Sequence, residues 1–255
     1  MRYWLVMPAA GAGQRFGAQL PKQYAPLAGR TVIEWALAPF LADAHCVGVR
    51  VVLAGGDAQW ARVAVRLDAR APRTPEQPPR LVSATGGAER SRSVRNGLAA
   101  LAGHAGPEDW VLVHDAVRPC LDATDLERLL DALEHHPLGG LLAVPAADTL
   151  KRAANGARED EPHVVETVER EALWRALTPQ MFRYGRLCAA LDEAHAAGRS
   201  PTDEAQALEW QGEHPRLIAG AAGNLKITTS ADLTLAAAVL AGRAHAAAGG
   251  MQGRL

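Results

Sequence analysis

The sequence has little lysine, few cysteines and no long apolar run, and these shortages narrow the class of protein. No uninterrupted apolar run among its 255 residues reaches the ~20 residues that a membrane-spanning helix needs. The N-terminus also lacks a basic region followed by an apolar stretch and a small-residue cleavage site, which is the pattern of a secretory signal. We therefore expect a cytoplasmic protein without a membrane partner.

The three cysteines, Cys46, Cys120 and Cys188, are scattered and have no CxxC spacing. An odd number of widely spaced cysteines is typical of reduced, mostly buried thiols, and it argues against a disulfide framework or a zinc site. We therefore expect no metal–thiolate centre.

Charge is almost balanced, with 27 basic and 28 acidic residues and a formal net charge of −1. This balance gives no general attraction to nucleic acid, so any anionic ligand must be bound by local groups. Only three of the basic residues are lysines, namely Lys22, Lys151 and Lys226. A compact ammonium suits a phosphoryl centre, although chance alone could also account for three lysines.

Apolar runs rich in valine, leucine and isoleucine alternate with segments of helical periodicity along the chain. This alternation predicts an α/β fold with a Rossmann-like, mostly parallel sheet and helices on both faces. The expected strands are Tyr3 to Met7, Val47 to Leu53, Arg80 to Ser83, Trp110 to His114 and Gly140 to Pro145.

Helix starts are indicated by hydroxyl residues at four places. A hydroxyl followed three residues later by glutamate is the capping-box pattern, and a hydroxyl before an alanine- and leucine-rich run is a weaker signal. The capping boxes are Thr31 with Glu34 and Thr124 with Glu127, and the weaker signals are Thr202 and Ser230.

Two segments interrupt the alternation. The proline-rich residues 71–79 indicate a surface loop, and residues 146–170 indicate a protruding hairpin arm. In this arm, Asp148 to Lys151 leads out, Asn155-Gly156 turns, and His163 to Val168 returns. We expect one domain over residues 1–255, with the arm at about 146–170 and a flexible tail at about 246–255.

The first expected strand runs directly into PAAGAGQRFGAQLPKQ, at residues 8–23. Backbone N–H groups of such a loop can bind phosphate at the carboxyl end of a strand. A dinucleotide site is the obvious alternative, but here the glycine spacing is GxGxxxG and the first capped helix begins only near Thr31. A loop of about twenty residues is long for such a connection, so we expect it to be functional.

This loop resembles the nucleotide-binding signature of the 2-C-methyl-D-erythritol 4-phosphate cytidylyltransferases. Further matches to this family follow in order over nearly all of the chain except its last twenty residues or so. They are GGAERSRSV at 86–94, VLVHDAVRP at 111–119, DTLKR at 148–152, TVEREALWRALTPQ at 167–180, TDEAQALE at 202–209 and NLKIT at 224–228. The resemblance implies that CMP is transferred from CTP to a polyol phosphate and that pyrophosphate is released, in isoprenoid precursor synthesis.

In such a transfer a phosphate oxygen of the acceptor attacks the α-phosphorus of CTP, so the protein mainly positions the substrates and neutralises charge. The resemblance implies catalytic roles for Arg15, Lys22, Arg170 and Lys226. A solvated lysine at a strand end remains the alternative interpretation of Lys226. The resemblance also implies Mg²⁺, or another divalent cation, held mainly by the CTP phosphates.

The CTP contacts implied by the resemblance are Ala9, Ala10, Gly11, Ala12, Gly13, Gly86 and Ser93. Glycine at Gly86 permits close backbone approach, and Ser93 offers a hydroxyl. Many family members have an acid where this chain has Ala88, so base recognition is expected to rest more on backbone groups.

The acceptor contacts implied by the resemblance are Asp115, Arg118, Thr149, Thr178 and Thr202. Asp115 follows an expected strand directly and is also a candidate metal contact, but it could instead cap the turn before Arg118. Thr202 could also be a plain helix cap. His114 lacks the paired carboxylate and hydroxyl of a catalytic triad, and we interpret it as structural.

Thr149 and Arg170 lie on the two sides of the arm, which family members exchange between the subunits of a homodimer. An ion pair of Arg170 with Glu159, Glu161, Glu166 or Glu169 is the alternative. Two other functions stay open, namely transfer to another polyol phosphate such as ribitol 5-phosphate, and nucleotide binding without catalysis.

Overall fold

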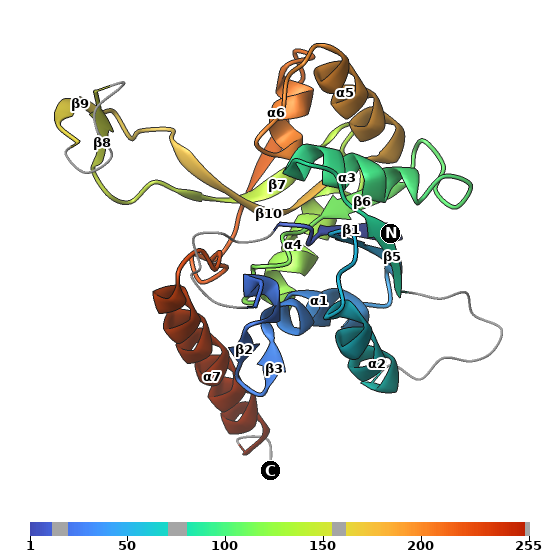
Figure 1. Cartoon of the computed structure of the whole chain (residues 1–255). Coiled ribbons are helices and arrows are strands. Elements are labelled where there is room, and N and C mark those ends of the chain that lie inside the picture. Colours follow the sequence, from blue (N-terminus) through green and yellow to red (C-terminus); the bar gives the residue numbers. More distant parts are fainter. Residues whose placement is uncertain (12–19, 71–80, 155–161, 253–255) are drawn as a thin grey trace.

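One central sheet of seven strands organises the chain in this computed structural model, which describes residues 1–11, 20–70, 81–154 and 162–252 (Figure 1). The strand order is β11-β7-β10-β6-β1-β4-β5. β1 pairs in parallel with both β4 and β6, so the predicted mostly parallel α/β sheet is confirmed. All five expected strands are present, as β1 (Tyr3–Pro8), β4 (Cys46–Leu53), β5 (Leu81–Thr85), β6 (Trp110–Val113) and β7 (Gly139–Pro145).

Two strands of the sheet go beyond the prediction. β10 (Trp174–Arg183) runs antiparallel between β6 and β7, and β11 (Arg216–Ala219) pairs in parallel with β7 at the sheet edge. β10 contains Pro179, which has no N–H to donate, and its ladder with β7 is irregular between Ala176 and Gln180. Hydrogen bonds from the two neighbouring strands therefore stabilise a strand whose own sequence is a poor strand pattern.

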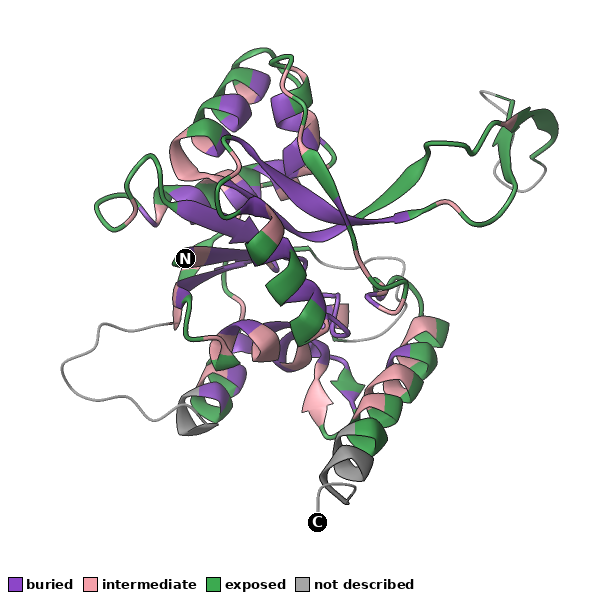
Figure 2. Cartoon of the chain, turned by 180° about the vertical axis from the view of Figure 1, so that it is seen from behind, coloured by how far each residue is buried: buried purple, intermediate pink, exposed green. Residues whose placement is uncertain are grey.

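Helices cover both faces of the sheet, as predicted (Figures 1 and 2). One face packs against α1 (Val32–Ala42), α2 (Trp60–Arg70) and α4 (Ala123–Leu133), and the other against α3 (Arg90–Ala99), α5 (Tyr184–Ala196) and α6 (Glu204–Glu209). The period-two alternation of a strand explains this division, because Leu5 and Met7 of β1 point into one core and Val6 into the other. None of the helices in the described residues is long and apolar enough to cross a membrane.

A third, small core lies where the last helix, α7 (Ser230–Gln252), meets the hairpin of β2 (Pro26–Leu27) and β3 (Arg30–Thr31). Its buried side chains include Ala25, Leu27, Val117, Ile227 and Ala236. These residues stand close in sequence to Lys22, Asp115 and Lys226, so burial of this core brings three distant segments to one end of the sheet.

The predicted helix starts are partly confirmed. The Glu34 carboxylate accepts hydrogen bonds from the Thr31 backbone N–H and hydroxyl at 2.8 and 2.7 Å, so the first capping box is present. α7 begins at Ser230, as predicted.

The expected cap at Thr124 is wrong, because the carboxylate of Asp122 caps α4 and accepts from the Thr124 N–H. A cap at Thr202 is also wrong, because Asp203 caps α6 by accepting from the Gln206 N–H at 3.0 Å. In both cases a neighbouring carboxylate, which is a stronger acceptor than a hydroxyl, takes the cap position.

The arm leaves the sheet as the predicted antiparallel hairpin, with β8 (Leu150–Ala153) paired to β9 (Val164–Val168) (Figure 1). Most of its side chains are exposed, including Val164 and Val165 at 64% and 62%. The predicted turn at Asn155-Gly156 and the predicted loop at 71–79 lie outside the described residues. α7 extends to Gln252, into the segment predicted as a tail.

Close packing of α3 on the sheet depends on Gly97. A Cβ at this position would lie 2.5 Å from Val6 Cγ1 and 2.7 Å from Val52 Cγ2. We expect Gly97→Ala to lower the free energy of unfolding by about 1–3 kcal/mol, measured by urea denaturation. Gly242→Ala is the matched control, since a Cβ there meets no atom within 4 Å, and we expect it to raise stability by about 0.5–1 kcal/mol. Equal stability of Gly97→Ala and the wild type would contradict this packing.

Glu34 couples stability to pH. Burial raises its pKa, but hydrogen bonds from Arg66 and Thr31 outweigh this effect and lower the pKa from 4.5 to about 2. Because the folded-state pKa is the lower one, the stabilisation is complete above about pH 5 and is lost as the pH falls through the folded-state pKa. We expect Glu34→Gln to lower the free energy of unfolding by roughly 1–2 kcal/mol at neutral pH and by less in acid. Urea denaturation over a pH series measures this, and a loss that does not vary with pH would exclude the carboxylate as its source.

Candidate active site

A cavity of about 200 Å³ lies at the carboxyl ends of β1 and β6. β4 and β5 lie on one side of β1, whereas β6 lies on the other, so the strand order reverses between β1 and β6. Open α/β sheets bind ligands at such a point. This cavity is therefore the candidate active site.

The cavity gathers predicted site residues from five separate segments of the chain. Those that line it are Ala9, Ala10, Gly11, Lys22, Ser93, Asp115 and Lys226. Gln23, Gly87, Ala88, Glu89 and Arg90 also contribute to its wall. The predicted residues Ala12, Gly13 and Arg15 lie outside the described residues.

The loop after β1 is held close to the loop after β5. The Ala9 N–H donates to the Val52 carbonyl at 2.7 Å, and the Gly86 N–H donates to the Leu53 carbonyl at 2.7 Å. A Cβ at Gly86 would lie 2.5 Å from Ala10 Cβ and 2.9 Å from Ser93 Oγ. Glycine is thus required here for the two loops to meet, and a direct contact of Gly86 with cytosine stays a prediction.

Ser93 supports the same loop from α3. Its Oγ accepts from the Gly87 N–H and donates to the Glu89 carbonyl, both at 3.1 Å. The side chain therefore fixes the shape of the turn that lines the cavity, and its contact with a ribose stays a prediction.

Lys22 is positioned by its buried neighbours. It begins the short helix η2 (Lys22–Tyr24), in which Gln23 donates to the Ala9 carbonyl at 2.8 Å and the Tyr24 hydroxyl donates to Asp57 at 2.7 Å. Both neighbours are at most 4% exposed. The ammonium of Lys22 is thus attached to a fixed backbone at the cavity wall.

Asp115 is the electrostatic centre of the site. Its Oδ2 lies 2.9 Å from Lys226 Nζ and 3.6 Å from Arg118 Nε, and its Oδ1 accepts from Arg90 Nε at 3.1 Å. Burial alone would raise the pKa of this carboxyl. The three cations lower the pKa by more than burial raises it, so the pKa is well below its usual range. Asp115 therefore stays ionised. The following turn is closed by the backbone, where the Arg118 N–H donates to the Asp115 carbonyl at 3.0 Å, while the carboxylate pairs with the three cations.

Lys226 is part of this cluster and is not an isolated surface lysine. Its side chain is 40% exposed, lines the cavity and forms the ion pair with Asp115. Arg118 lies deeper, at 8% exposure, where its guanidinium donates to the Asn224 carbonyl at 2.8 Å. Arg118 thus holds the loop that carries Lys226 from behind Asp115.

His114 and Thr178 form a buried support below Asp115. Thr178 Oγ1 accepts from the Asp115 N–H at 3.1 Å and lies 3.0 Å from His114 Nδ1, whose ring is fully buried. Burial lowers the pKa of His114 to about 4, so the ring is neutral at physiological pH. The geometry agrees with a structural His114, while contact of Thr178 with an acceptor stays a prediction.

Arg90 and Glu204 form an ion pair beside Asp115 that is missing from the predicted set. Arg90 binds both Glu204 oxygens, at 2.7 and 3.2 Å, and Glu204 is 1% exposed. Both residues belong to recognised motifs, GGAERSRSV and TDEAQALE, and each is the first residue of a helix. The pair spans 114 positions, so nothing local in the sequence indicates that the two side chains meet.

Six described residues of the predicted set do not line this cavity. Gly86, Arg118 and Thr178 lie directly against residues that line it, whereas the other three lie elsewhere on the surface. Thr149 and Arg170 are exposed on the arm, where the Arg170 guanidinium donates to the Ala147 carbonyl. Thr202 is exposed before α6, where its N–H donates to the Gln206 side chain. The acceptor roles of all three stay predictions.

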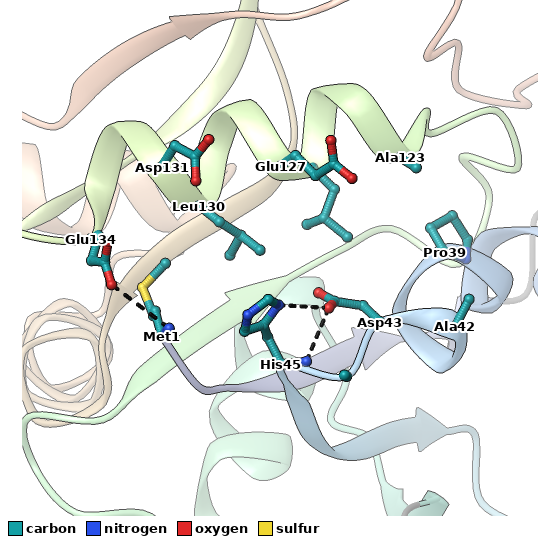
Figure 3. A pocket seen from close by; sticks show the side chains of 12 residues that line it. Met1, Pro39, Ala42, Asp43, His45, Ala123, Glu127, Leu130, Asp131 and Glu134 are labelled. Atoms are coloured by element: carbon teal, nitrogen blue, oxygen red, sulfur yellow. Dashed lines mark hydrogen bonds and ion pairs between the residues drawn. The ribbon is translucent and has the colours of Figure 1, made fainter.

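A larger cavity of about 320 Å³ lies between the end of α1 and α4 (Figure 3). It contains none of the predicted site residues, and carboxylates surround its apolar floor. They belong to Asp43, Glu127, Asp131 and Glu134. An acidic rim repels phosphates, so size alone does not identify the nucleotide site.

A family profile and similar proteins agree on one family for this chain. A sequence profile described as IspD: 2-C-methyl-D-erythritol 4-phosphate cytidylyltransferase matches residues 3–242. The protein of that name from Halorhodospira halophila is 53% identical over 240 residues, which cover 94% of each chain. Its counterpart from Acidithiobacillus ferrooxidans is 50% identical over 248 residues, covering 96% of this chain and 98% of the relative.

Solved structures agree with the sequence relatives. A crystal structure of 4-diphosphocytidyl-2C-methyl-D-erythritol synthase matches with a TM-score of 0.75 at 35% identity, covering 94% of this chain and 98% of that chain. The 2-C-methyl-D-erythritol 4-phosphate cytidylyltransferase of Thermus thermophilus matches with a TM-score of 0.71 at 31% identity and the same coverage. The chain therefore belongs to the 2-C-methyl-D-erythritol 4-phosphate cytidylyltransferase family.

Proposed function

We propose that the protein transfers CMP from CTP to 2-C-methyl-D-erythritol 4-phosphate, releasing pyrophosphate and forming 4-diphosphocytidyl-2-C-methyl-D-erythritol for isoprenoid precursor synthesis. The observation that carries this function is the cationic cavity around Asp115, at the strand-order reversal of a family member. Relatives of the same name support the identity of both substrates.

The proposed reaction is a direct displacement. An acceptor phosphate oxygen forms a bond to the α-phosphorus of CTP while the bond to the pyrophosphate oxygen breaks, so no covalent intermediate with the protein is needed. Lys22 and Lys226, on separate segments of the cavity wall, supply positive charge to the phosphates. Arg15 would add a third cation from the segment outside the described residues.

The loop geometry favours binding of the nucleoside beside α3. The backbone of residues 9–11 and of Gly87 lies there, with Ser93 fixing the turn. Ala88 is exposed at this wall and offers no side-chain acceptor for cytosine. We therefore propose that backbone groups recognise most of the base.

Magnesium is part of the proposal. Among the described residues, no group of three or more His, Cys, Asp or Glu side chains is arranged to hold a metal ion. Both Asp115 oxygens already contact cations, so the residues fit an ion that takes most of its ligands from the triphosphate, with Asp115 as a candidate protein ligand. When bound, Mg²⁺ would neutralise phosphate oxygens. The proposed compartment is the cytoplasm, because three widely spaced cysteines without a CxxC pattern fit a reducing environment.

The exposed arm supports a proposed homodimer in which each arm contributes Thr149 and Arg170 to the partner's acceptor site. Both residues lie outside the cavity of their own chain, and Val164 and Val165 leave apolar surface uncovered on the arm. A two-fold dimer would cover this surface and complete the acceptor side of both cavities.

Pyrophosphate release tests the proposed reaction. With Mg²⁺, we expect release from CTP and 2-C-methyl-D-erythritol 4-phosphate, and none when ATP, GTP or UTP replaces CTP. We expect Lys22→Met and Lys226→Met each to lower the rate by ~10²–10³, because each removes a charge that stabilises the transition state. Arg62→Met, which removes an exposed cation of α2, is the matched control.

The outcomes of this assay separate the alternatives. Release with ribitol 5-phosphate in place of the methylerythritol substrate would keep the mechanism and overturn the acceptor. No release with any pair would favour nucleotide binding without catalysis.

Mixing two inactive variants tests the shared site. In a heterodimer of Arg170→Ala and Lys226→Met subunits, one of the two sites has both residues intact. Random exchange of subunits should therefore restore roughly a quarter of wild-type activity. A mixture as inactive as its components, or a hydrodynamic mass of one protomer, would show that each site is built from a single chain.

A further inference from the structure

Arg90 joins two carboxylates that come from distant parts of the chain. Its two terminal nitrogens bind Glu204, and its Nε binds Asp115 Oδ1 at 3.1 Å. Burial lowers the pKa of this guanidinium, but the two carboxylates raise it more, so Arg90 remains charged. One cation thus links α6 to the centre of the active site.

Glu204 provides a fixed anchor for Arg90. The start of α6 is clamped by Gln180 of β10, which donates to the Asp203 carboxylate and accepts from the Ala205 N–H, both at 2.9 Å. Glu204 lies between these two residues and is 1% exposed. Arg90 is therefore oriented by a rigid part of the fold that does not line the cavity.

The negative charge of Asp115 limits how freely Lys226 can bind a phosphate. A phosphate that enters the cavity competes with Asp115 for Lys226, whose Nζ lies 2.9 Å from Asp115 Oδ2. Removing one partner of a buried ion pair is costly when the remaining charge has no other compensation. Among the described residues, the other cations paired with Asp115, whose side chain is 8% exposed, are Arg90 and Arg118.

We propose that Arg90, held by Glu204, is a positioning residue that compensates Asp115 and so frees Lys226 to bind the phosphates of the nucleotide. The proposal rests on the proposed function, because it takes CTP as the ligand. Arg90 acts through Asp115 in this arrangement. The competing arrangement is direct contact of Arg90 with the triphosphate, since Arg90 also lines the cavity.

CTP affinity in a set of variants separates these arrangements. The paired change Arg90→Gln/Glu204→Gln removes both charges together, so that neither partner is left buried and uncompensated. We expect it to weaken Mg²⁺–CTP binding roughly tenfold or more, measured by calorimetry without acceptor. Arg90→Lys keeps a charge beside Asp115 and should restore affinity to within about threefold of wild type.

The matched control is Arg95→Gln/Asp192→Asn. Arg95 is also on α3, and it binds both oxygens of Asp192 on α5, at 2.7 and 2.8 Å and away from the cavity. Removing this second ion pair should change CTP affinity by less than about twofold. Thermal unfolding checks that each variant is folded. If the paired amides do not fold, the apolar pair Arg90→Leu/Glu204→Met replaces them.

The decisive comparison uses Asp115→Asn. Without the carboxylate, Lys226 has no ion pair that competes with the phosphates of CTP. Adding Arg90→Gln/Glu204→Gln to Asp115→Asn should therefore weaken CTP binding by less than about twofold. An equal loss with and without Asp115 would instead show direct contact between Arg90 and the nucleotide and would overturn the proposal. Wild-type affinity in the paired variant would also overturn it.

The NMR signal of Lys226 provides a readout that would not change if Arg90 had only a structural role. With only three lysines in the chain, ¹³C-methylated lysine signals can each be assigned from a Lys→Arg variant. We expect CTP to shift the Lys226 signal in the wild type and to shift it less in the paired variant at saturation. If the wild type does not bind CTP at all, the proposed function fails; if it binds and both Lys226 signals shift equally, only the role of Arg90 fails.

Discussion

A carboxylate buried among three cations is the constraint on which the site depends. Asp115 cannot be ionised at this depth without compensation, so Arg90, Arg118 and Lys226 must converge on it. These side chains come from the start of α3, the turn after β6 and the loop before α7. One electrostatic requirement therefore brings together the charged side chains of three separate segments.

Hydrophobic burial makes that convergence possible. The small core around Leu27, Val117 and Ile227 holds two of these segments, the turn after β6 and the loop before α7, against the segment that follows Lys22. The Ile227 N–H donates to the Val117 carbonyl at 2.8 Å. Apolar contacts set the backbone, and the ion pairs then set the directions of the charged side chains. This division suits a site for anions, because positive charge is concentrated locally although the net charge of the chain is only −1.

Most of the central sheet could be predicted from local patterns in the sequence. Alternating apolar runs predict five strands of the sheet, and the sequence of the loop after β1 predicts a phosphate-binding segment at a strand end. β10 was not predictable in this way, because its hydrogen bonds come from β6 and β7 and Pro179 obscures the strand pattern. Caps at Thr124 and Thr202 also failed, because adjacent carboxylates compete more strongly for the same N–H groups.

The sequence by itself determined the fold class, the family and the residue types of a nucleotidyl-transfer site, since these depend on periodicity and on motifs that are local in the chain. Only the tertiary structure decided which charges share a partner. Arg90 and Glu204 are 114 positions apart, and Asp115 is the common neighbour of three cations from three segments. Coulomb interactions depend on distance in space and on burial, and neither quantity exists until the chain has folded.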